Sequence, residues 1–274
     1  MYMKLKDGKS KVLTLSYDDG MVEDIRLIQI MDKYGLKGTF NINTGLYSPE
    51  DKECKANRRR MKLSEAVPLY RNSAHEVAVH GYTHPYLDQL KSQEVLVQIL
   101  KDRENIEKQY GVITRGMAYP YGTYNDNVIE CLRQCGIAYS RAAKSTEGFS
   151  FPQNWLTLNP TCHHGNERLM EIAKRFVEEN PYLHNNWMFY LWGHSFEFTD
   201  NDNWEVIEEF AEYIGGRNEI WYATNIEIYD YVKAYESLRI SIDKTIVHNP
   251  SDIDVWFFEN GKTYTIKAGE TINI

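Results

Sequence analysis

Two adjacent aspartates end the first apolar run of the chain, in the stretch VLTLSYDDG at residues 12–20. Neighbouring carboxylates repel each other, and a bound cation relieves that repulsion. Asp18 and Asp19 could then divide the work of a hydrolytic site, with one carboxylate coordinating the cation and the other accepting a proton from water. The pair is also compatible with a plain helix N-cap, because Gly20 and a helical pattern follow it.

Two histidines four residues apart, His80 and His84, follow another apolar run. This spacing puts both imidazoles on one side of a helical turn, and zinc favours such ligands. Taken alone, the pair is a weak signal, and two ordinary surface or capping histidines explain it more simply. Together with one aspartate they have the make-up of a hydrolytic zinc site, which leaves positions open for water and substrate.

Strand-like and helix-like patterns alternate over most of the chain and place these residues at the ends of strands. We predict strands at residues 11–17, 37–43, 76–80, 115–121, 137–142, 187–194 and 220–224. We predict helices at residues 21–34, 63–71, 92–110, 125–135, 166–179, 202–214 and 226–237. Repeated strand–helix alternation is typical of a parallel sheet, either open or closed into a barrel.

Four of the predicted strands carry polar or unusual residues where they end. The first ends in the aspartate pair, the third in His80, the fourth in AYPYG at residues 118–122, and the sixth in His194. The carboxyl ends of parallel strands form the active site in such α/β folds. We therefore expect these residues to meet at one edge of the sheet.

The pattern changes after about residue 238, where short alternating strands replace the strand–helix units. The pair Asn260-Gly261 is typical of a tight hairpin turn. We therefore predict two parts, an α/β part at residues 1–237 and a small antiparallel β appendage at residues 238–274. The appendage offers no evident chemistry.

Composition argues against several classes of protein. The 274 residues carry a formal net charge of −8, whereas a nucleic-acid partner calls for a basic face. The one dense basic run, Arg58-Arg59-Arg60, fits a solvated loop. No apolar stretch approaches the roughly 18 residues of a membrane span, and the N-terminus lacks the apolar core of a signal peptide.

The four cysteines contain no CxxC pair, and Cys131 and Cys135 are spaced as buried residues of one helix. We expect a soluble protein of a reducing compartment, the cytoplasm, with an exported longer form left open. The sequence does not indicate the oligomeric state.

The motifs resemble those of the polysaccharide deacetylases, or NodB-homology carbohydrate esterases (carbohydrate esterase family 4). The family motif Thr-Phe-Asp-Asp-Gly corresponds to SYDDG at residues 16–20, and His-Ser/Thr-x-x-His corresponds to HGYTH at residues 80–84. Arg-x-Pro-Tyr/Phe-Gly corresponds to AYPYG at residues 118–122. The strand end Leu-x-His corresponds to LWGH at residues 191–194, with one residue more between Leu and His. The motifs follow the family order and cover about residues 11 to 236.

The resemblance implies a distorted (β/α) barrel of parallel strands with a hydrolytic site. A divalent metal, usually zinc, would be held by Asp19, His80 and His84. Asp18 would be the general base, His194 the general acid that protonates the leaving group, and the backbone N–H of Tyr121 a donor to the oxyanion. Preorganised donors of this kind stabilise the negative oxygen that develops during acyl hydrolysis.

Two departures from the family concern the surroundings of the base and the acid. The arginine that steadies the base in the family is Ala118 here, and the family's fourth motif, with an acid and a tryptophan, is not recognisable. Arg141, near the end of the predicted strand at residues 137–142, could supply the missing guanidinium or be a surface arginine. Glu197, three residues beyond His194, could orient that histidine or be a solvated glutamate.

Further histidines and aromatic residues lie near the motifs. His163 and His164 in TCHHGN could mimic a metal site, but successive residues of a strand point to opposite faces, so one of them could face the pocket. Aromatic residues crowd the motif ends and could line a carbohydrate groove or be ordinary packing; they are Tyr86, Tyr119, Tyr121, Trp192, Phe196 and Phe198.

We therefore predict a hydrolase that uses Zn²⁺ or another divalent transition metal to remove N- or O-linked acetyl groups from a carbohydrate. Two alternatives stay open. One is hydrolysis of another C–N bond, such as a cyclic amide, and the other is a carbohydrate-binding relative without turnover. The intact aspartates and histidines argue against the second alternative, while the missing third-motif arginine argues for it.

Overall fold

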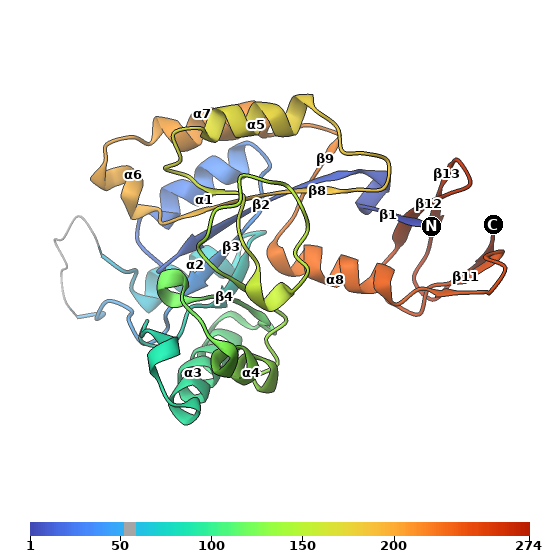
Figure 1. The fold of residues 1–274 in the computed structure, drawn as a ribbon. Coiled ribbons are helices and arrows are strands. Elements are labelled where there is room, and N and C mark those ends of the chain that lie inside the picture. Colours follow the sequence, from blue (N-terminus) through green and yellow to red (C-terminus); the bar gives the residue numbers. More distant parts are fainter. Residues whose placement is uncertain (52–58) are drawn as a thin grey trace.

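Strand β2 (Lys11–Asp18) is central to the computed structural model, which describes residues 1–51 and 59–274. All 8 of its residues are buried. Along one edge it pairs in parallel with β8 (Trp187–Gly193). Along the other it pairs with β9 (Ile220–Tyr222) near its start and with β3 (Gly38–Ile42) near its end. Strand β2, which ends at Asp18, therefore runs through the middle of the sheet (Figure 1).

The remaining parallel strands extend the sheet on both sides of β2. They are β4 (Glu76–Val79), β5 (Gly116–Ala118), β6 (Tyr139–Arg141) and β7 (Cys162–His163). The order along the sheet is β6-β5-β4-β3-β2-β8-β7. One segment of the chain contacts strands on both sides of β2. Leu158 pairs with Arg141 of β6, and shortly afterwards Cys162 pairs with β8. The sheet curls into a half-barrel, which confirms the predicted distorted (β/α) barrel.

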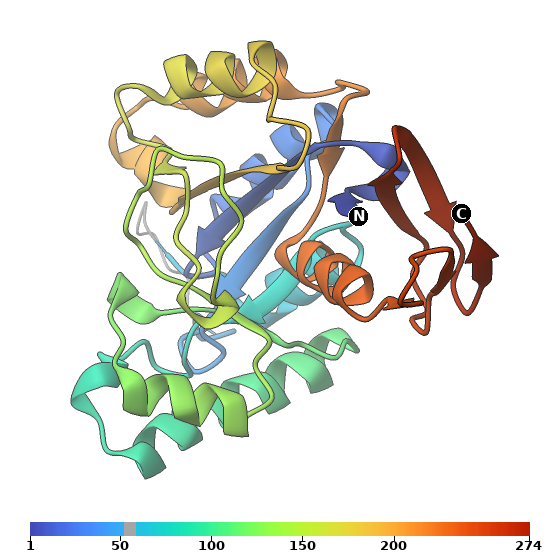
Figure 2. The same ribbon diagram turned by 45° about the vertical axis from the view of Figure 1, so that its right-hand side comes forward.

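Helices surround the curled sheet. They are α1 (Asp24–Lys33), α2 (Leu63–Arg71), α3 (Ser92–Tyr110), α4 (Asp126–Gln134), α5 (Leu169–Glu178), α6 (Phe196–Asp200), α7 (Glu205–Ile214) and α8 (Asn225–Glu236). Most cover the outer face of the sheet, and one, α8, packs with Val12 and Tyr190 of its inner face. In α5 the buried side chains recur every three or four positions and form one apolar face. These side chains are Leu169, Ile172, Ala173 and Phe176. α5 and α7 lie side by side along one flank, and α3 and α4 along the opposite flank (Figures 1 and 2).

The two faces of β2 differ in chemistry because side chains alternate along a strand. The main apolar core takes Leu13, Leu15 and Tyr17. The opposite face is buried but polar. Thr14 Oγ1 donates to Asn225 Oδ1 over 2.9 Å, and Asn41 Nδ2 donates to Asp18 Oδ1 over 2.9 Å. This face of β2 therefore carries polar groups that have hydrogen-bond partners, and Asp18 is the last of them.

Besides shifts of a few residues at the ends of other elements, three differences from the prediction concern the site and its surroundings. The strand predicted at residues 115–121 ends at Ala118, because Pro120 and the left-handed Tyr121 form a 3₁₀ turn at Pro120–Gly122. The helix predicted at residues 202–214 starts at Glu205, after the separate short helix α6. β7 has no counterpart in the prediction, since 2 residues are too few to show a period. Further 3₁₀ turns are Lys6–Gly8, Leu87–Gln89 and Trp155–Thr157.

The last part of the chain forms small antiparallel sheets. One has the order β10-β11-β14, with β10 (Arg239–Ile240), β11 (Ile246–His248) and β14 (Thr271–Asn273). The other has the order β1-β12-β13, with β1 (Tyr2–Lys4), β12 (Val255–Glu259) and β13 (Lys262–Ile266). Asn260 and Gly261 turn between β12 and β13 with positive φ, as a tight hairpin requires. The N-terminal strand thus lies with the C-terminal ones (Figure 2), and the division at residue 237 stays a prediction.

Two sequence predictions concern features away from the sheet. Cys131 and Cys135 are buried at α4, as predicted, while Cys54 and Arg58 lie outside the described residues. Within the part of the chain that the structure describes, no helix is both long and apolar enough to cross a bilayer.

We expect Tyr231→Phe to destabilise the protein, because this hydroxyl joins α8 to β1 and β12. Tyr231 Oη donates to the Lys4 carbonyl over 2.6 Å and accepts from the Trp256 backbone N–H over 3.0 Å. Losing both bonds costs roughly 1–3 kcal/mol. Denaturant unfolding measures the loss, with Tyr235→Phe as control, because Tyr235 makes a longer bond of 3.3 Å to the Met1 carbonyl. Equal midpoints for the two variants would contradict the expectation.

Candidate active site

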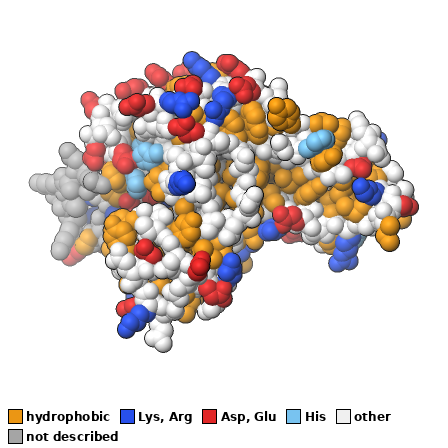
Figure 3. Space-filling model, in the orientation of Figure 1, with side chains coloured by type: hydrophobic (Ala, Val, Ile, Leu, Met, Phe, Trp, Pro, Cys, Tyr) orange, Lys and Arg blue, Asp and Glu red, His pale blue; other side chains and the backbone are white. Residues whose placement is uncertain are grey.

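One cavity brings together the residues of the motifs. It has a volume of about 400 Å³ and lies at the carboxyl ends of the parallel strands. All the predicted site residues line it: Asp18, Asp19, His80, His84, Tyr121, Arg141 and His194. They come from the ends of β2, β4, β6 and β8 and from the turn after β5. In the left half of Figure 3, histidine side chains reach the surface beside acidic ones.

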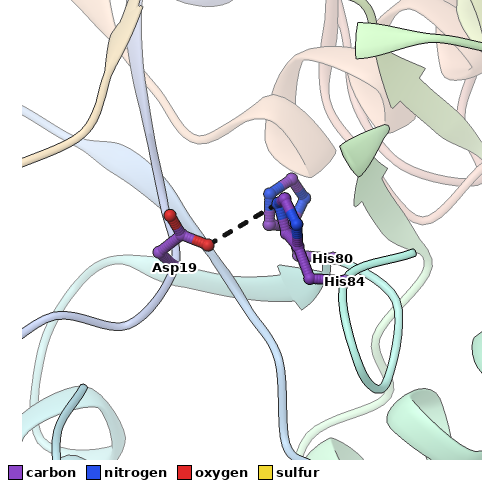
Figure 4. A group of neighbouring side chains, drawn as sticks. All are labelled: Asp19, His80 and His84. Atoms are coloured by element: carbon purple, nitrogen blue, oxygen red, sulfur yellow. Dashed lines mark ion pairs between the residues drawn. The ribbon is translucent and has the colours of Figure 1, made fainter. Parts of the chain in front are cut away.

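Asp19, His80 and His84 form a compact group of possible metal ligands. Each offers one ligand atom, and these atoms all lie within 4.8 Å of one another. The Asp19 carboxylate points toward the two imidazole rings (Figure 4), and its Oδ1 lies 3.7 Å from His84 Nε2. Two imidazoles and one carboxylate suit zinc or a related divalent cation and leave coordination positions open.

The hydrogen bonds of His80 leave its Nε2 atom able to bind a cation. His80 Nδ1 lies 2.8 Å from the Ala118 carbonyl oxygen, an acceptor, so the ring hydrogen belongs on Nδ1. Nε2 is buried and has no hydrogen-bond partner among the described residues. Burial lowers the pKa of His80, which favours the neutral ring that a metal ligand must have. The residues present therefore fit a divalent cation.

Asp102, which the sequence analysis missed, holds the backbone at His80. One of its oxygens accepts the His80 backbone N–H over 3.1 Å. The other accepts the backbone N–H and the hydroxyl of Thr44 over 2.8 and 2.7 Å. Burial raises the pKa of Asp102 to about 7. The sequence did carry a signal, because an aspartate here occupies the apolar stripe of α3, whose other buried members are Val95, Ile99, Ile106 and Tyr110.

Three site residues have a backbone in the left-handed region, which side chains rarely adopt. The φ angle is +84° at Asp19, +55° at His84 and +59° at Tyr121. Gly20 and Gly122, which follow two of them, also have positive φ. Such conformations cost of the order of 1–3 kcal/mol each and cluster at functional sites. The chain therefore turns sharply where it presents these side chains.

Arg141 forms a fully buried ion pair with Asp18. It is the register partner of Ala118 on the neighbouring strand, so a guanidinium from β6 reaches Asp18, where the third-motif arginine is missing. Burial alone would raise the pKa of Asp18, but Arg141 and the nearby His80 and His194 lower it to about 2. Asp18 is therefore ionised at neutral pH.

His194 lies between two carboxylates at the end of β8. Its Nε2 is 4.0 Å from Asp18 Oδ2, and its Nδ1 is 3.3 Å from Glu197 Oε1. Burial alone would lower the pKa of His194, but the nearby carboxylates of Glu197 and Asp18 raise it. A raised pKa favours the protonated ring that a general acid needs. Of the two alternatives for Glu197, the structure supports contact with His194, since the carboxylate faces that ring.

The histidines of TCHHGN contact Glu197 and lie apart from the Asp19 ligand group. The Nε2 atoms of His163 and His164 are each 3.0 Å from Glu197 Oε2. The expectation that the two rings point to opposite faces is wrong, because β7 ends at His163 and the chain turns before His164. Both rings therefore reach the same carboxylate.

Arg60 contacts the site, although the basic run was predicted to be a solvated loop. Arg60 Nη2 lies 2.8 Å from Asp19 Oδ1, and Nη1 donates to Asn43 Oδ1 over 2.7 Å. The backbone of Arg60 pairs with Met21, beside the turn after β2. This cation offsets part of the negative charge of the aspartate pair. Nothing in a run of like charges marks one of them as the partner of a distant motif.

The aromatic residues near the motifs divide between rim and core. Tyr86 and Tyr121 stack with ring centroids 3.7 Å apart, and both are about half exposed. Trp192 lines the cavity, and its ring lies 4.3 Å from the guanidinium carbon of Arg141. The residues Tyr119, Phe196 and Phe198 are buried. The exposed tyrosine pair offers an apolar surface beside the cavity.

The family model described as polysaccharide deacetylase matches residues 5–140, about half of the chain. The peptidoglycan-N-acetylglucosamine deacetylase PgdA of Listeria monocytogenes serotype 1/2a is 25% identical over 155 residues, which cover 53% of this chain and 28% of that protein. The uncharacterized protein YlxY of Bacillus subtilis is 26% identical over 105 residues, which cover 38% of this chain and 29% of that protein. The chain thus matches less than a third of the length of these relatives.

Solved structures share the fold. A putative polysaccharide deacetylase from Mycobacterium smegmatis aligns with a TM-score of 0.60 at 15% identity, over 86% of this chain and 94% of that one. A variant of the peptidoglycan deacetylase PdaC from Bacillus subtilis aligns with a TM-score of 0.53 at 19% identity, over 83% and 94%. With the family match and the motifs in the cavity, these findings show that the chain belongs to the polysaccharide deacetylase superfamily.

We expect Gly122→Ala to cost more stability than Gly111→Ala. Both glycines have positive φ, +71° and +72°, so each substitution strains the backbone by about 1 kcal/mol. At Gly111 the added methyl group meets nothing within 4 Å, whereas at Gly122 it would lie 2.5 Å from Ala143 Cβ. Urea unfolding of both variants measures the difference. Equal losses would show that the turn after β5 can shift freely.

Proposed function

We propose that the protein is a metal-dependent hydrolase that removes N- or O-linked acetyl groups from a carbohydrate. The observation that carries the proposal is the meeting, in one cavity, of a two-histidine, one-aspartate ligand group with a second ionised aspartate and a further histidine. Hydrolysis of an acyl group by water needs a base, an acid and a stabiliser of the oxyanion. The cavity holds a candidate for each role.

Asp19, His80 and His84 would hold the divalent cation, and zinc suits their donor atoms. When bound, the cation supplies Lewis acidity, which polarises an acyl carbonyl and lowers the pKa of a nearby water. The buried Nε2 atom of His80, without a partner among the described residues, supports this assignment.

Asp18 would accept the proton of the attacking water as the water oxygen bonds to the acyl carbon. Arg141 and Asn41 each donate to the carboxylate of Asp18, so it is ionised and fixed in direction. Asp19 lies beyond the strand end, in the left-handed turn, and faces the two histidines. Different neighbours therefore give the two adjacent carboxylates different roles.

His194 would donate its Nε2 proton to the leaving nitrogen or oxygen as the bond from that atom to the acyl carbon breaks. The backbone N–H of Tyr121 has no acceptor among the described residues, so it is available to the oxygen that becomes negative. Tyr121 lines the cavity, which supports this role.

The exposed tyrosine pair at the rim supports a carbohydrate substrate, because aromatic faces pack well against the apolar faces of sugars. The relative PgdA is named a peptidoglycan-N-acetylglucosamine deacetylase, so N-acetylglucosamine oligomers are the first substrates to test, with acetylated xylan beside them. We expect acetate release that chelation abolishes and added zinc restores. Full activity of a metal-free preparation would contradict the metal requirement. Hydrolysis of a cyclic amide, without acetate release from either carbohydrate, would favour the alternative C–N hydrolase.

We expect the two adjacent aspartates to respond differently to asparagine. Asp19→Asn removes an anionic ligand and should weaken zinc affinity strongly. Asp18→Asn should leave zinc affinity nearly intact but lower kcat roughly 10²–10⁴-fold, the usual worth of a general base. Calorimetric zinc titration and acetate-release kinetics measure both effects. Equal loss of zinc by both variants would show a joint ligand, and unaltered kcat in both would contradict the proposed function.

We expect Arg141→Ala to lower kcat far more than it raises KM, because Asp18 loses the cation that orients it. Arg141→Lys keeps the charge and should restore part of kcat. Arg115→Ala, which removes a more exposed ion pair with Asp230, is the control for loss of an arginine. Steady-state kinetics on one acetylated substrate give both constants. Values of kcat and KM within twofold of the wild type for Arg141→Ala would rule out the role.

A further inference from the structure

Glu197 lies among three histidine rings on the wall of the cavity. Its Oε2 is 3.0 Å from the Nε2 atoms of both His163 and His164. Its Oε1 is 3.3 Å from Nδ1 of His194. One carboxylate therefore joins the end of β7 to the histidine that follows β8.

Hydrogen bonding assigns the ring hydrogen of His163. The backbone N–H of Gly165 donates to His163 Nδ1 over 3.1 Å, so Nδ1 carries the lone pair. In the neutral ring the hydrogen is then on Nε2, which faces Glu197. A ring in this state cannot offer Nε2 to a metal ion. The group of His163, His164 and Glu197, which has the donor types of a second cation site, is therefore better explained as a hydrogen-bonded carboxylate.

Charge in this group is concentrated on Glu197. Burial alone would raise the pKa of Glu197, but the three histidines beside it hold it well below its usual range. Burial lowers the pKa of His164 and favours its neutral form. His163 and His164 thus contact one oxygen of an ionised carboxylate, and its other oxygen is left for His194.

Strand β8 makes room for His164. A side chain at Gly193 would overlap the His164 ring, whose Nδ1 lies against this glycine. The His164 backbone N–H donates to the Trp192 carbonyl over 2.8 Å, which fixes the ring at that level of the strand. The stretch LWGH has one residue more than the Leu-x-His motif. The glycine immediately before His194 leaves the space that the His164 ring occupies.

We infer that His163 and His164 hold Glu197 in place and that Glu197 positions His194 for proton donation. The inference rests on the proposed function, in which His194 protonates the leaving group. With a hydrogen on Nδ1, His194 faces Glu197 Oε1 over 3.3 Å, and its Nε2–H faces the cavity. When that proton passes to the leaving atom, the bond from the atom to the acyl carbon breaks. His194 then becomes neutral and keeps its hydrogen on Nδ1, which faces Glu197. The other three are positioning residues, which act through His194.

Substrates with different leaving groups separate this role from general damage to the site. An amide nitrogen needs protonation to leave, whereas 4-nitrophenyl acetate releases a stable phenolate. We expect Glu197→Leu and His164→Leu to lower kcat roughly 10–100-fold on N-acetylglucosamine oligomers and less than about threefold on 4-nitrophenyl acetate. His164→Gln, whose amide can still donate to Glu197, should retain more activity than His164→Leu. His184→Gln is the control, because His184 is exposed and lines no part of this cavity.

Two outcomes of these assays would overturn the inference. Equal losses on both substrates would show that the variants damage the whole site. A second equivalent of zinc, bound by the wild type and lost in His164→Leu, would show that the histidine pair holds a cation.

A measurement without turnover keeps this inference separate from the proposed function. The ¹⁵N chemical shifts of His194 report which ring nitrogen carries the hydrogen. We expect Nδ1–H in the neutral ring of the wild type and a shift toward Nε2–H in Glu197→Leu. If no substrate releases acetate, the proposed function fails, while this spectrum still decides whether Glu197 fixes His194. Unaltered His194 shifts in Glu197→Leu would overturn the inference.

Discussion

The buried ion pair between Asp18 and Arg141 is the interaction on which the rest of the site depends. The two side chains are 3% and 1% exposed. Removing charges from water costs several kcal/mol per ion, and only good geometry with further hydrogen bonds offsets this. Asn41 adds such a bond to Asp18, and the Trp192 ring covers the guanidinium. If either charge were lost, the other would be left uncompensated beneath the cavity, so β2 and β6 have to bring them together.

This requirement explains why the sheet has to curl. In the order β6-β5-β4-β3-β2 the two strands lie four steps apart. At about 4.8 Å a step, their ends in a flat sheet would be roughly 19 Å apart, beyond the reach of an ion pair. Curling brings the ends of β2 and β6 to face each other across the polar interior. The same curvature brings His194 at the end of β8 and the histidines His80 and His84 after β4 into one cavity.

The sequence predicted the parallel strands and the motif residues because both depend on local pattern. A strand end with Asp18 and Asp19 can be recognised from nine residues. The contacts of Arg60 could not be predicted, because they depend on where a loop returns in space. For Arg141 the sequence left two roles open, the missing guanidinium or a surface arginine. Only the register of β5 with β6 places it opposite Ala118.

Backbone strain was equally hidden from the sequence. Gly20 and Gly122 have positive φ, but the left-handed conformation belongs also to the residues before them, Asp19 and Tyr121. A pattern of apolar residues cannot show this, because it reports which side chains are buried and not how the chain turns between strands. Asp102 was different, since a carboxylate within the apolar stripe of a helix is visible in the sequence and was overlooked.

Strand β1 pairs with β12, so Met3 meets Phe257 across nearly the whole length of the chain. A ribosome releases the first of these strands long before it has made the second, and the edge of β1 stays unpaired through most of synthesis. Contacts so distant along a chain form late, because the entropy of closing the intervening loop opposes them until other structure has shortened it. Folding of the half-barrel around β2 shortens the loop that remains to be closed between β1 and β12. The hydroxyl of Tyr231 gains both of its backbone partners only when translation has passed Trp256, so the two ends of the protein can join only after that point.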